Sequence, residues 1–209
     1  MRRDDIQELH YMTAVVNVPS IVRAGILSHE ASKHTPHVSI ASEEVQARRA
    51  TRTIPGGLRL HQYANLYFNA RNSMLFRRLR DYDANERVPA EEIAILRVAV
   101  DVLDRRGVVI TDINAAADEE PRWHSVEEGL PLLDKTTIYA PSWNHSDYWD
   151  KVRRMQQMMA EVLVPHRVEP EYLLGAYAVS EAAASVLSGL SPTLEVVVQP
   201  YMYFEGPRP

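Results

Sequence analysis

One acidic side chain at the start of a short apolar segment is the first candidate for chemistry. Glu161 opens the run Glu161-Val162-Leu163-Val164, and Pro165 closes it. Such a run is typical of a buried strand, so the carboxylate would be fixed at the mouth of a rigid element. A fixed carboxylate can stabilise positive charge that develops in a reaction. The pattern alone favours a plainer interpretation, in which Glu161 faces water or pairs with an arginine, because an unpaired buried carboxylate is costly.

A segment rich in arginine is the second candidate. From Val45 to Arg80 the sequence has eight arginines and no aspartate or glutamate. The arginines are Arg48, Arg49, Arg52, Arg59, Arg71, Arg77, Arg78 and Arg80. Tyrosines and phenylalanines lie between them, which suits a surface that binds phosphates and stacks on bases. The plainer alternative is a solvated surface balanced by the acidic stretch 81–130, but arginine throughout favours recognition of a phosphate or a carboxylate.

Histidines give little support for a metal site. His29, His34 and His37 lie in a polar segment that we expect to be a loop, and the chain has no cysteine. Because structural zinc sites are built mainly from cysteine and histidine, no metal site is predicted there. The sequence leaves open whether the segment from His29 to His37 closes over a substrate as a lid.

The predicted elements around these residues are short. An amphipathic helix is predicted from about 147 to 159, with Ser146 as its N-cap, directly before the strand that begins at Glu161. Further strands are predicted at 9–13, 38–41, 63–68, 93–100, 108–110, 176–179 and 194–198. Further helices are predicted at 18–24, 43–49 and 181–187, the first ended by Gly25 and the last by Gly189.

The composition bounds the class of protein. The chain has 209 residues, of which 45% are hydrophobic and 24% charged, and its formal net charge is -5. These values are typical of a globular protein, and no repeat or linker divides the chain, so we expect a single α+β domain over residues 1–209. We recognise no membrane-spanning run and no signal peptide, and therefore expect a cytoplasmic protein.

Five segments together resemble the DarT family of DNA ADP-ribosyltransferase toxins. They occur in the family's order and cover nearly the whole chain. The segments are His10-Tyr11-Met12-Thr13 with Asn17 and Ala24-Gly25, Ser39-Ile40-Ala41 with Gln46-Ala47-Arg48-Arg49, Tyr67 to Leu75, Thr111-Asp112 with Ala115-Ala116, and Trp143-Asn144 with Arg153-Arg154 and Ala160 to Val164. The chain departs from the family at Ala70 and Ser73, where proline is frequent, and at Asn114, where some members have histidine.

The resemblance implies an ADP-ribosyltransferase fold, in which central, twisted, mostly antiparallel strands are flanked by helices. It implies NAD as a co-substrate, no metal, and transfer of ADP-ribose to a base in single-stranded DNA, which is thymine in the best-known branch. Such toxins are paired with an antitoxin, DarG, whose macrodomain removes the modification. Two alternatives stay open: the same fold acting on RNA, guanine, protein or water, and a nucleic-acid-binding module without catalysis.

The resemblance also implies roles for residues of this chain. Glu161 would stabilise the oxocarbenium character of the ribose as nicotinamide leaves. Arg48 would clamp the pyrophosphate or stabilise the base as its ring nitrogen loses a proton, and Arg49 is the close alternative. The residues that would bind NAD are His10, Thr13, Asn17, Gly25 and Arg48. The residues that would lie near the DNA are Tyr67, Arg71, Met74 and Arg154.

Overall fold

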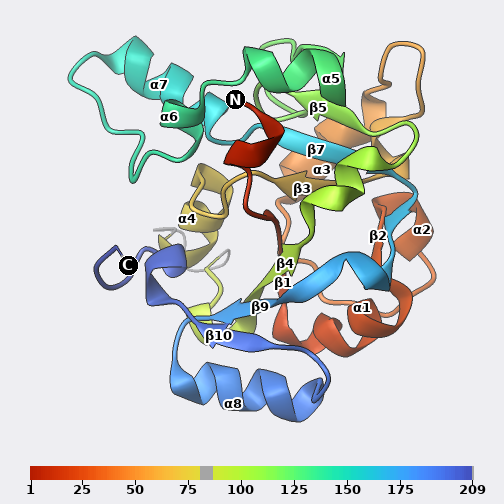
Figure 1. Ribbon diagram of the computed structural model, residues 1–209, viewed down its shortest axis with the longest axis vertical. Coiled ribbons are helices and arrows are strands. Elements are labelled where there is room, and N and C mark those ends of the chain that lie inside the picture. The colour runs from red at the N-terminus through yellow and green to blue at the C-terminus, as the bar shows by residue number, and fades with distance from the viewer. Residues whose placement is uncertain (81–86, 209) are drawn as a thin grey trace.

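An eight-stranded sheet forms the centre of the computed structural model, which describes residues 1–80 and 87–208 (Figure 1). The strands follow the order β10-β9-β4-β1-β3-β7-β5-β6, and neighbours are antiparallel apart from the parallel pair β9 and β10. Their bounds are β1 Leu9–Ala14, β3 Tyr63–Tyr67, β4 Ile93–Val98, β5 Val109–Thr111, β6 Trp123–Ser125, β7 Glu161–Pro165, β9 Leu173–Ala178 and β10 Val196–Val198. The expected fold class, with a mostly antiparallel central sheet and flanking helices, is confirmed.

Helices flank this sheet, and a small second sheet lies beside it. The helices are α1 Val18–Ala24, α2 His29–Ser32, α3 Glu43–Thr51, α4 Ser73–Arg80, α5 Val126–Gly129, α6 Lys135–Ile138, α7 Tyr148–Gln157 and α8 Glu181–Leu190. α8 packs along β9 and β10 at the foot of Figure 1. The second sheet pairs β2 Ile26–Leu27 with β8 Arg167–Val168. Within the described ranges, no helix has the length and apolar character needed to cross a membrane.

The apolar residues of the central strands alternate between two clusters of the core. On β4, Ala94, Leu96 and Val98 belong to one cluster, whereas Ile93 and Ile95 belong to the other. Successive side chains of a strand face opposite sides of the sheet, which explains this division. Because both faces of the central strands are covered, these strands read as nearly continuous apolar runs in the sequence.

The junction of β1 and β3 is the feature of the sheet that makes room for a site. Among the described residues these two strands pair at one register position, His10 opposite Tyr67. The last pair between β3 and β7 is Tyr67 opposite Glu161. His10, Tyr67 and Glu161 therefore lie side by side across three strands. Beyond this line β1 and β3 separate. Along its whole length β1 pairs with β4, and β3 pairs with β7.

Two predicted helix ends are wrong in detail. The N-cap of α7 is Asp147 and not Ser146, because the Asp147 side chain accepts a hydrogen bond from the N–H of Asp150. α8 does not stop at Gly189 but runs to Leu190. A glycine ends a helix when the backbone there turns to positive φ, and Gly189 keeps the helical conformation.

Gly25 ends α1 as predicted, and its replacement by alanine is expected to destabilise the fold by roughly 3 kcal/mol. Its φ is +85°, and an added Cβ would overlap the carbonyl oxygen of Val168 on β8. Gly189→Ala is the matched control, because nothing lies within 4 Å of that position and alanine favours a helix over glycine. Urea unfolding should show a large loss for Gly25→Ala and none for Gly189→Ala. Equal stability of the two variants would contradict the close approach of α1 and β8.

Candidate active site

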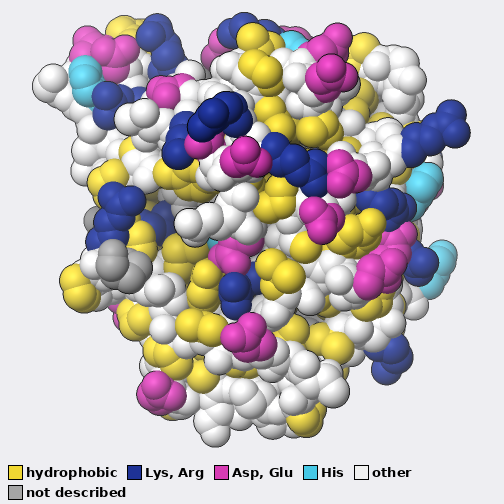
Figure 2. All heavy atoms as spheres, in the orientation of Figure 1, with side chains coloured by type: hydrophobic (Ala, Val, Ile, Leu, Met, Phe, Trp, Pro, Cys, Tyr) yellow, Lys and Arg dark blue, Asp and Glu magenta, His cyan; other side chains and the backbone are white. Residues whose placement is uncertain are grey.

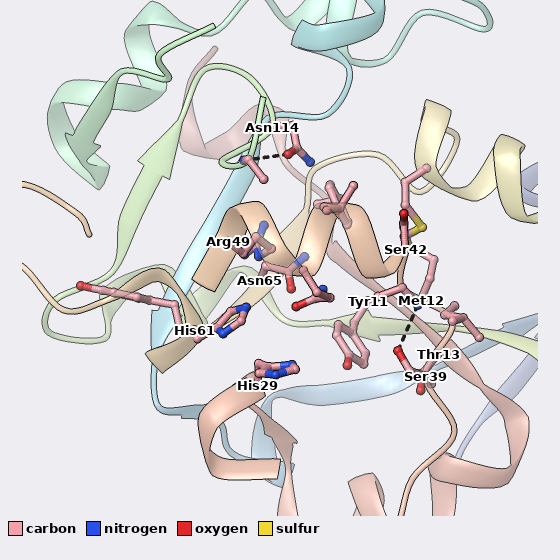
Figure 3. Close-up of a pocket in the computed structure, with 18 of the residues that line it drawn as sticks. Tyr11, Met12, Thr13, His29, Ser39, Ser42, Arg49, His61, Asn65 and Asn114 are labelled. Carbon is pink, nitrogen blue, oxygen red and sulfur yellow. Dashed lines mark hydrogen bonds between the residues drawn. The ribbon is translucent and has the colours of Figure 1, made fainter. Parts of the chain in front are cut away.

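A cavity of about 400 Å³ opens where β1 and β3 separate (Figure 3). Its size is within the usual range for small-molecule sites. β1 contributes Tyr11, Met12 and Thr13 to the lining, and β3 contributes Tyr63, Asn65 and Tyr67. Other parts of the wall come from α1, α2, α3, α4, α7 and the segment 33–42. The cavity is thus enclosed by elements from both halves of the sheet.

A buried ion pair lies directly behind the wall of this cavity: Arg49 is a lining residue, whereas its partner Glu161 lies outside the lining. Glu161 is fully buried, and Nη1 of Arg49 lies 3.0 and 3.2 Å from its two carboxylate oxygens. The N–H of Ala115 donates a further hydrogen bond of 3.1 Å to Oε1. The backbone N–H of Glu161 donates to Oγ1 of Thr111, so the strand end that carries the carboxylate is also fixed. These bonds hold the acidic group in one orientation directly behind Arg49, which lines the cavity.

The two adjacent arginines of α3 have different partners. Arg48 donates a hydrogen bond of 2.5 Å to Asp118, whose side chain is 90% exposed. Arg49 is buried against Glu161. Consecutive residues of an α-helix point about 100° apart, so only one of two neighbours can reach a given group. The structure therefore brings Arg49 to the carboxylate and leaves Arg48 at the cavity mouth.

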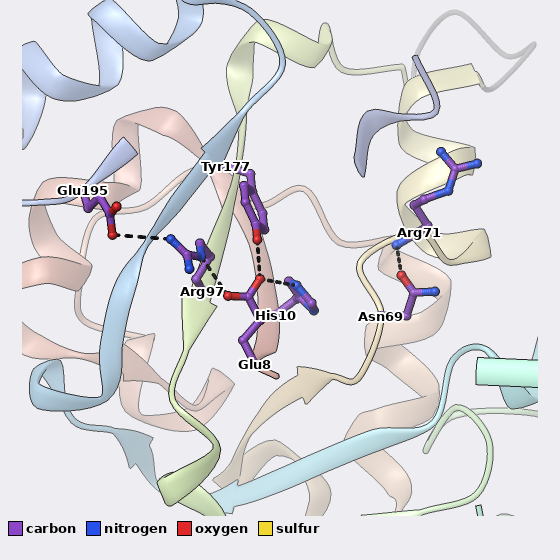
Figure 4. Close-up of polar contacts among 7 residues, drawn as sticks. All are labelled: Glu8, His10, Asn69, Arg71, Arg97, Tyr177 and Glu195. Atoms are coloured by element: carbon purple, nitrogen blue, oxygen red, sulfur yellow. Dashed lines mark hydrogen bonds and ion pairs between the residues drawn. The ribbon is translucent and has the colours of Figure 1, made fainter. Parts of the chain in front are cut away.

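His10, expected to bind NAD, lies outside the cavity lining. Its Nε2 is 3.2 Å from Oε1 of Glu8, and its ring stacks near that of Tyr177 (Figure 4). The next residue, Tyr11, lines the cavity instead. Sequence reasoning missed Tyr11, because both faces of β1 are covered and the apolar pattern does not show which face meets the cavity.

Glu8 is the centre of the polar network around His10 (Figure 4). Its carboxylate accepts hydrogen bonds from Arg97 and the Tyr177 hydroxyl. Burial opposes ionisation of Glu8, but the hydrogen bonds from His10, Tyr177 and Arg97 outweigh it and lower its pKa from 4.5 to about 2. The charged form is therefore favoured in the folded protein.

Glu8→Gln is expected to lower the free energy of unfolding at pH 7 by about 3 kcal/mol. A depressed pKa gives stability that is present above pH 4.5 and is lost as the pH falls towards 2. The difference between wild type and variant should therefore shrink between these two values, as measured by urea unfolding. Glu195→Gln is the control, because Glu195 contacts Arg97 in the same network but is 67% exposed. A deficit of Glu8→Gln that did not change with pH would contradict this account.

Asn17 and Thr13 join the segment 33–42 to the cavity wall. The Asn17 side chain donates to the carbonyl of Val38 at 2.7 Å and accepts from its N–H at 2.9 Å. It also donates to Oγ1 of Thr13 at 3.1 Å. The predicted strand 38–41 is wrong, because these residues form no strand and their backbone is held by the Asn17 amide instead. Thr13, Asn17 and Gly25 all line the cavity.

The four residues expected near DNA divide into two pairs. Tyr67 and Met74 line the cavity, whereas Arg71 and Arg154 lie outside its lining. Burial, followed by the Glu161 carboxylate, raises the pKa of the Tyr67 phenol far above its ordinary value. Asn114, at the family's variable position, also lines the cavity.

Arg71 is engaged with the C-terminal segment. Its guanidinium donates to the carbonyls of Tyr201 and Pro141, and it lies 4.0 Å from the centre of the Tyr201 ring and 4.4 Å from that of Phe204. Burial lowers the pKa of Arg71. Arg71 therefore anchors the segments around residues 141 and 201 to each other.

The arginines of the segment 45–80 divide into residues that line the cavity and residues that hold the surrounding segments. Its members that line the cavity are Arg48, Arg49, Arg77 and Arg78. By contrast, Arg52 donates to the carbonyls of Ala115 and Ala117, and Arg59 pairs with Glu30. On the face shown in Figure 2, basic and acidic side chains are interspersed. Within residues 1–80 and 87–208, no group of three histidine, aspartate or glutamate residues could hold a metal ion.

Comparisons with known proteins identify relatives of the whole chain. The family model described as "DarT: ssDNA thymidine ADP-ribosyltransferase" matches residues 10–204. A DNA ADP-ribosyl transferase–DNA ADP-ribosyl glycohydrolase fusion protein of Thermosipho africanus is 30% identical over 203 residues, which are 95% of this chain and 50% of the relative. This chain therefore spans about half the length of that protein.

Solved structures share the fold. Thermosipho africanus DarTG in complex with ADP-ribose superposes with a TM-score of 0.80 at 29% identity, over 94% of this chain and 51% of the other. Thermus sp. 2.9 DarT, solved with ADP-ribosylated ssDNA, superposes with a TM-score of 0.76 at 22% identity, over 95% and 97% of the two chains. The same Thermus protein has also been solved with NAD+, and that structure gives a TM-score of 0.72.

Proposed function

The chain belongs to the DarT family, whose model matches residues 10–204, and we propose that it transfers ADP-ribose from NAD to thymine in single-stranded DNA. The observation that carries this proposal is the buried Glu161, held by Arg49 and Ala115 directly behind the wall of the cavity, which Arg49 lines. The NAD+ and ADP-ribosylated ssDNA bound by the Thermus relative support the two substrates. We take residues 1–209 as one transferase domain, because the sheet uses strands from Leu9 to Val198.

In the proposed reaction, the bond between nicotinamide and ribose breaks, and the nicotinamide leaves with the bonding electrons. The ribose then carries oxocarbenium character, which the Glu161 carboxylate stabilises. In the free protein the guanidinium of Arg49 covers this carboxylate, so a ribose hydroxyl replaces one of the two Arg49 contacts when NAD binds. The thymine ring nitrogen loses its proton to water and forms the new bond to the ribose, and Arg49 stabilises the negative charge that develops on the base.

The remaining roles follow from position. Thr13, Asn17, Gly25 and Arg48 line the cavity and are proposed to bind NAD. Tyr67 and Met74 are proposed to meet the acceptor base, since they line the cavity on β3 and α4. We place Arg154, on α7, beside the DNA backbone outside the cavity. For Arg71 we propose a shaping role, because its guanidinium is occupied by backbone carbonyls and aromatic rings.

The chain is proposed to act as a toxin. Its Thermosipho relative joins a DNA ADP-ribosyl transferase to a DNA ADP-ribosyl glycohydrolase in one protein. An enzyme that removes the modification is therefore the expected antitoxin partner, of the macrodomain type named DarG. Because NAD and DNA are the proposed substrates, we propose that the protein acts in the cytoplasm.

Incubation with NAD and short single-stranded oligonucleotides tests the proposal. A mass gain of one ADP-ribose, confined to oligonucleotides that contain thymine, is the expected result. Modification of guanine, RNA or protein instead would identify a different acceptor for the same transfer reaction. Release of free ADP-ribose without modified DNA would indicate a glycohydrolase. Salt-sensitive DNA binding without consumption of NAD would indicate a module without catalysis.

A further inference from the structure

Two imidazole rings lie against each other in the cavity wall. His29 begins α2, and His61 lies in the short 3-10 helix η3 Leu60–Gln62. The ring centroids are 4.1 Å apart with an angle of 32° between the planes, and both residues line the cavity (Figure 3). The segment from His29 was expected to be a loop. Instead it begins with the short helix α2, whose N-cap Ser28 accepts a hydrogen bond from the N–H of Ala31. No step of the proposed transfer reaction uses this pair.

Two cationic side chains act on the two rings, Lys33 from the segment after α2 and Arg49 from α3. The other titratable groups that act on them are His37 and the partner imidazole. The acid on the same helix, Glu30, is engaged by Arg59 at 2.9 Å and by the amide of Gln62. The Glu161 carboxylate forms a salt bridge with Arg49. The pair therefore lies in a positive environment in which the nearby acids have other partners.

One ring nitrogen of the pair has no hydrogen-bond partner among the described residues. This nitrogen is Nε2 of His61, which is buried. The ring also bonds to the backbone of Gln46 on α3, which orients it. Burial and the neighbouring His29 and Arg49 charges lower the pKa of His61 to about 4, and the pKa of His29 is lowered as well. Both rings are thus neutral near pH 7 in the free protein.

We propose that His29 and His61 form a phosphate-binding subsite that takes up one proton from solvent when the phosphate binds. An anion placed beside the two rings supplies the negative charge that this end of the cavity lacks. Its field favours the imidazolium form, so one ring gains a proton and donates a charge-assisted hydrogen bond to a phosphate oxygen. The inference rests on the proposed function, because the expected ligand of the subsite is the diphosphate of NAD. A phosphodiester group of the DNA has the same chemistry.

Proton uptake on binding is the direct test. Calorimetric titration with ADP-ribose at pH 6 to 8, in buffers of different ionisation enthalpy, gives the number of protons taken up. We expect between about 0.5 and 1 proton near pH 6, and a dissociation constant that falls by up to about tenfold per pH unit as the pH is lowered. Adenosine, which has no phosphate, should bind without uptake. Uptake with an oligonucleotide and not with ADP-ribose would support the subsite and assign it to the DNA; no uptake with either would overturn it.

Ring replacements separate this role from folding. His61→Phe and His29→Phe each keep an aromatic ring but remove one titrating group. Both should keep the melting temperature within a few degrees, and at least one should abolish proton uptake and weaken ADP-ribose binding at pH 6 by about tenfold. His34→Gln is the matched control, because His34 is exposed and lies outside the cavity lining. Uptake that survives in both phenylalanine variants would overturn the proposal.

The outcome for the subsite is distinguishable from that for the transfer reaction. If DNA is modified while ADP-ribose binds without proton uptake, the inference about the histidines fails and the proposed function stands. If no acceptor is modified while proton-linked binding of ADP-ribose is observed, the subsite stands and the proposed function fails.

Discussion

Glu161→Gln is expected to reduce the transfer of ADP-ribose by about a thousandfold while the protein stays folded. Glutamine has the same shape and can still accept hydrogen bonds from Arg49 and from the N–H of Ala115. It lacks the negative charge that stabilises the ribose cation, and this charge is the part of the side chain that acts mainly in the transition state. The loss should therefore appear in kcat more than in KM.

The measurement is the rate at which an oligonucleotide gains ADP-ribose, with the melting temperature recorded for each variant. Asp104→Asn is the matched control, because it also neutralises a carboxylate that is paired with an arginine, but at an exposed position outside the cavity lining. Its rate should stay within about threefold of wild type. Comparable rates for Glu161→Gln and wild type would remove the central residue of the proposed mechanism.

Arg49→Lys is expected to slow transfer by about a hundredfold, whereas Arg48→Lys should slow it by no more than about tenfold, through weaker binding of NAD. Arg49 contacts Glu161 from a buried position, and a lysine there keeps the charge but loses the planar guanidinium that can bond to the carboxylate and to a ligand together. Arg48 pairs with the exposed Asp118, and a lysine there keeps the positive charge that we propose to bind NAD.

These two variants are each other's control, since they make the same replacement at adjacent positions of α3. Transfer rates, binding of ADP-ribose and melting temperatures should be compared for both. A large loss in Arg48→Lys with a small one in Arg49→Lys would restore the assignment that the sequence motif favoured.

Much of the fold could be predicted because the local signals agree with the tertiary structure. β7 is a short apolar run closed by Pro165, and α1 ends at a glycine whose positive φ is required there. The strand predicted at 38–41 is wrong, although its mixture of apolar and small polar residues is typical of a strand. The Asn17 side chain, which lies 21 positions before Val38 in the sequence, makes hydrogen bonds to the backbone of Val38. Such a long-range partner leaves no local pattern.

The site was less predictable than the fold. Of the residues of α3, all of which the structure describes, only Arg49 is buried. A charged residue on the buried side of a helix gives no apolar periodicity. The sequence therefore does not show which face of α3 is buried, and it does not decide between Arg48 and Arg49. The same limit applied to β1, where coverage of both faces concealed that Tyr11, and not His10, meets the cavity.

The pairing of β1 with β3 at His10 and Tyr67 divides the sheet into two four-stranded halves, β10-β9-β4-β1 and β3-β7-β5-β6. When two rigid plates share one hinge, a rotation displaces their outer parts most and the hinge line least. Glu161 lies next to that line, opposite Tyr67. A rotation of the two halves about this line would therefore widen the cavity while moving the Glu161 carboxylate least.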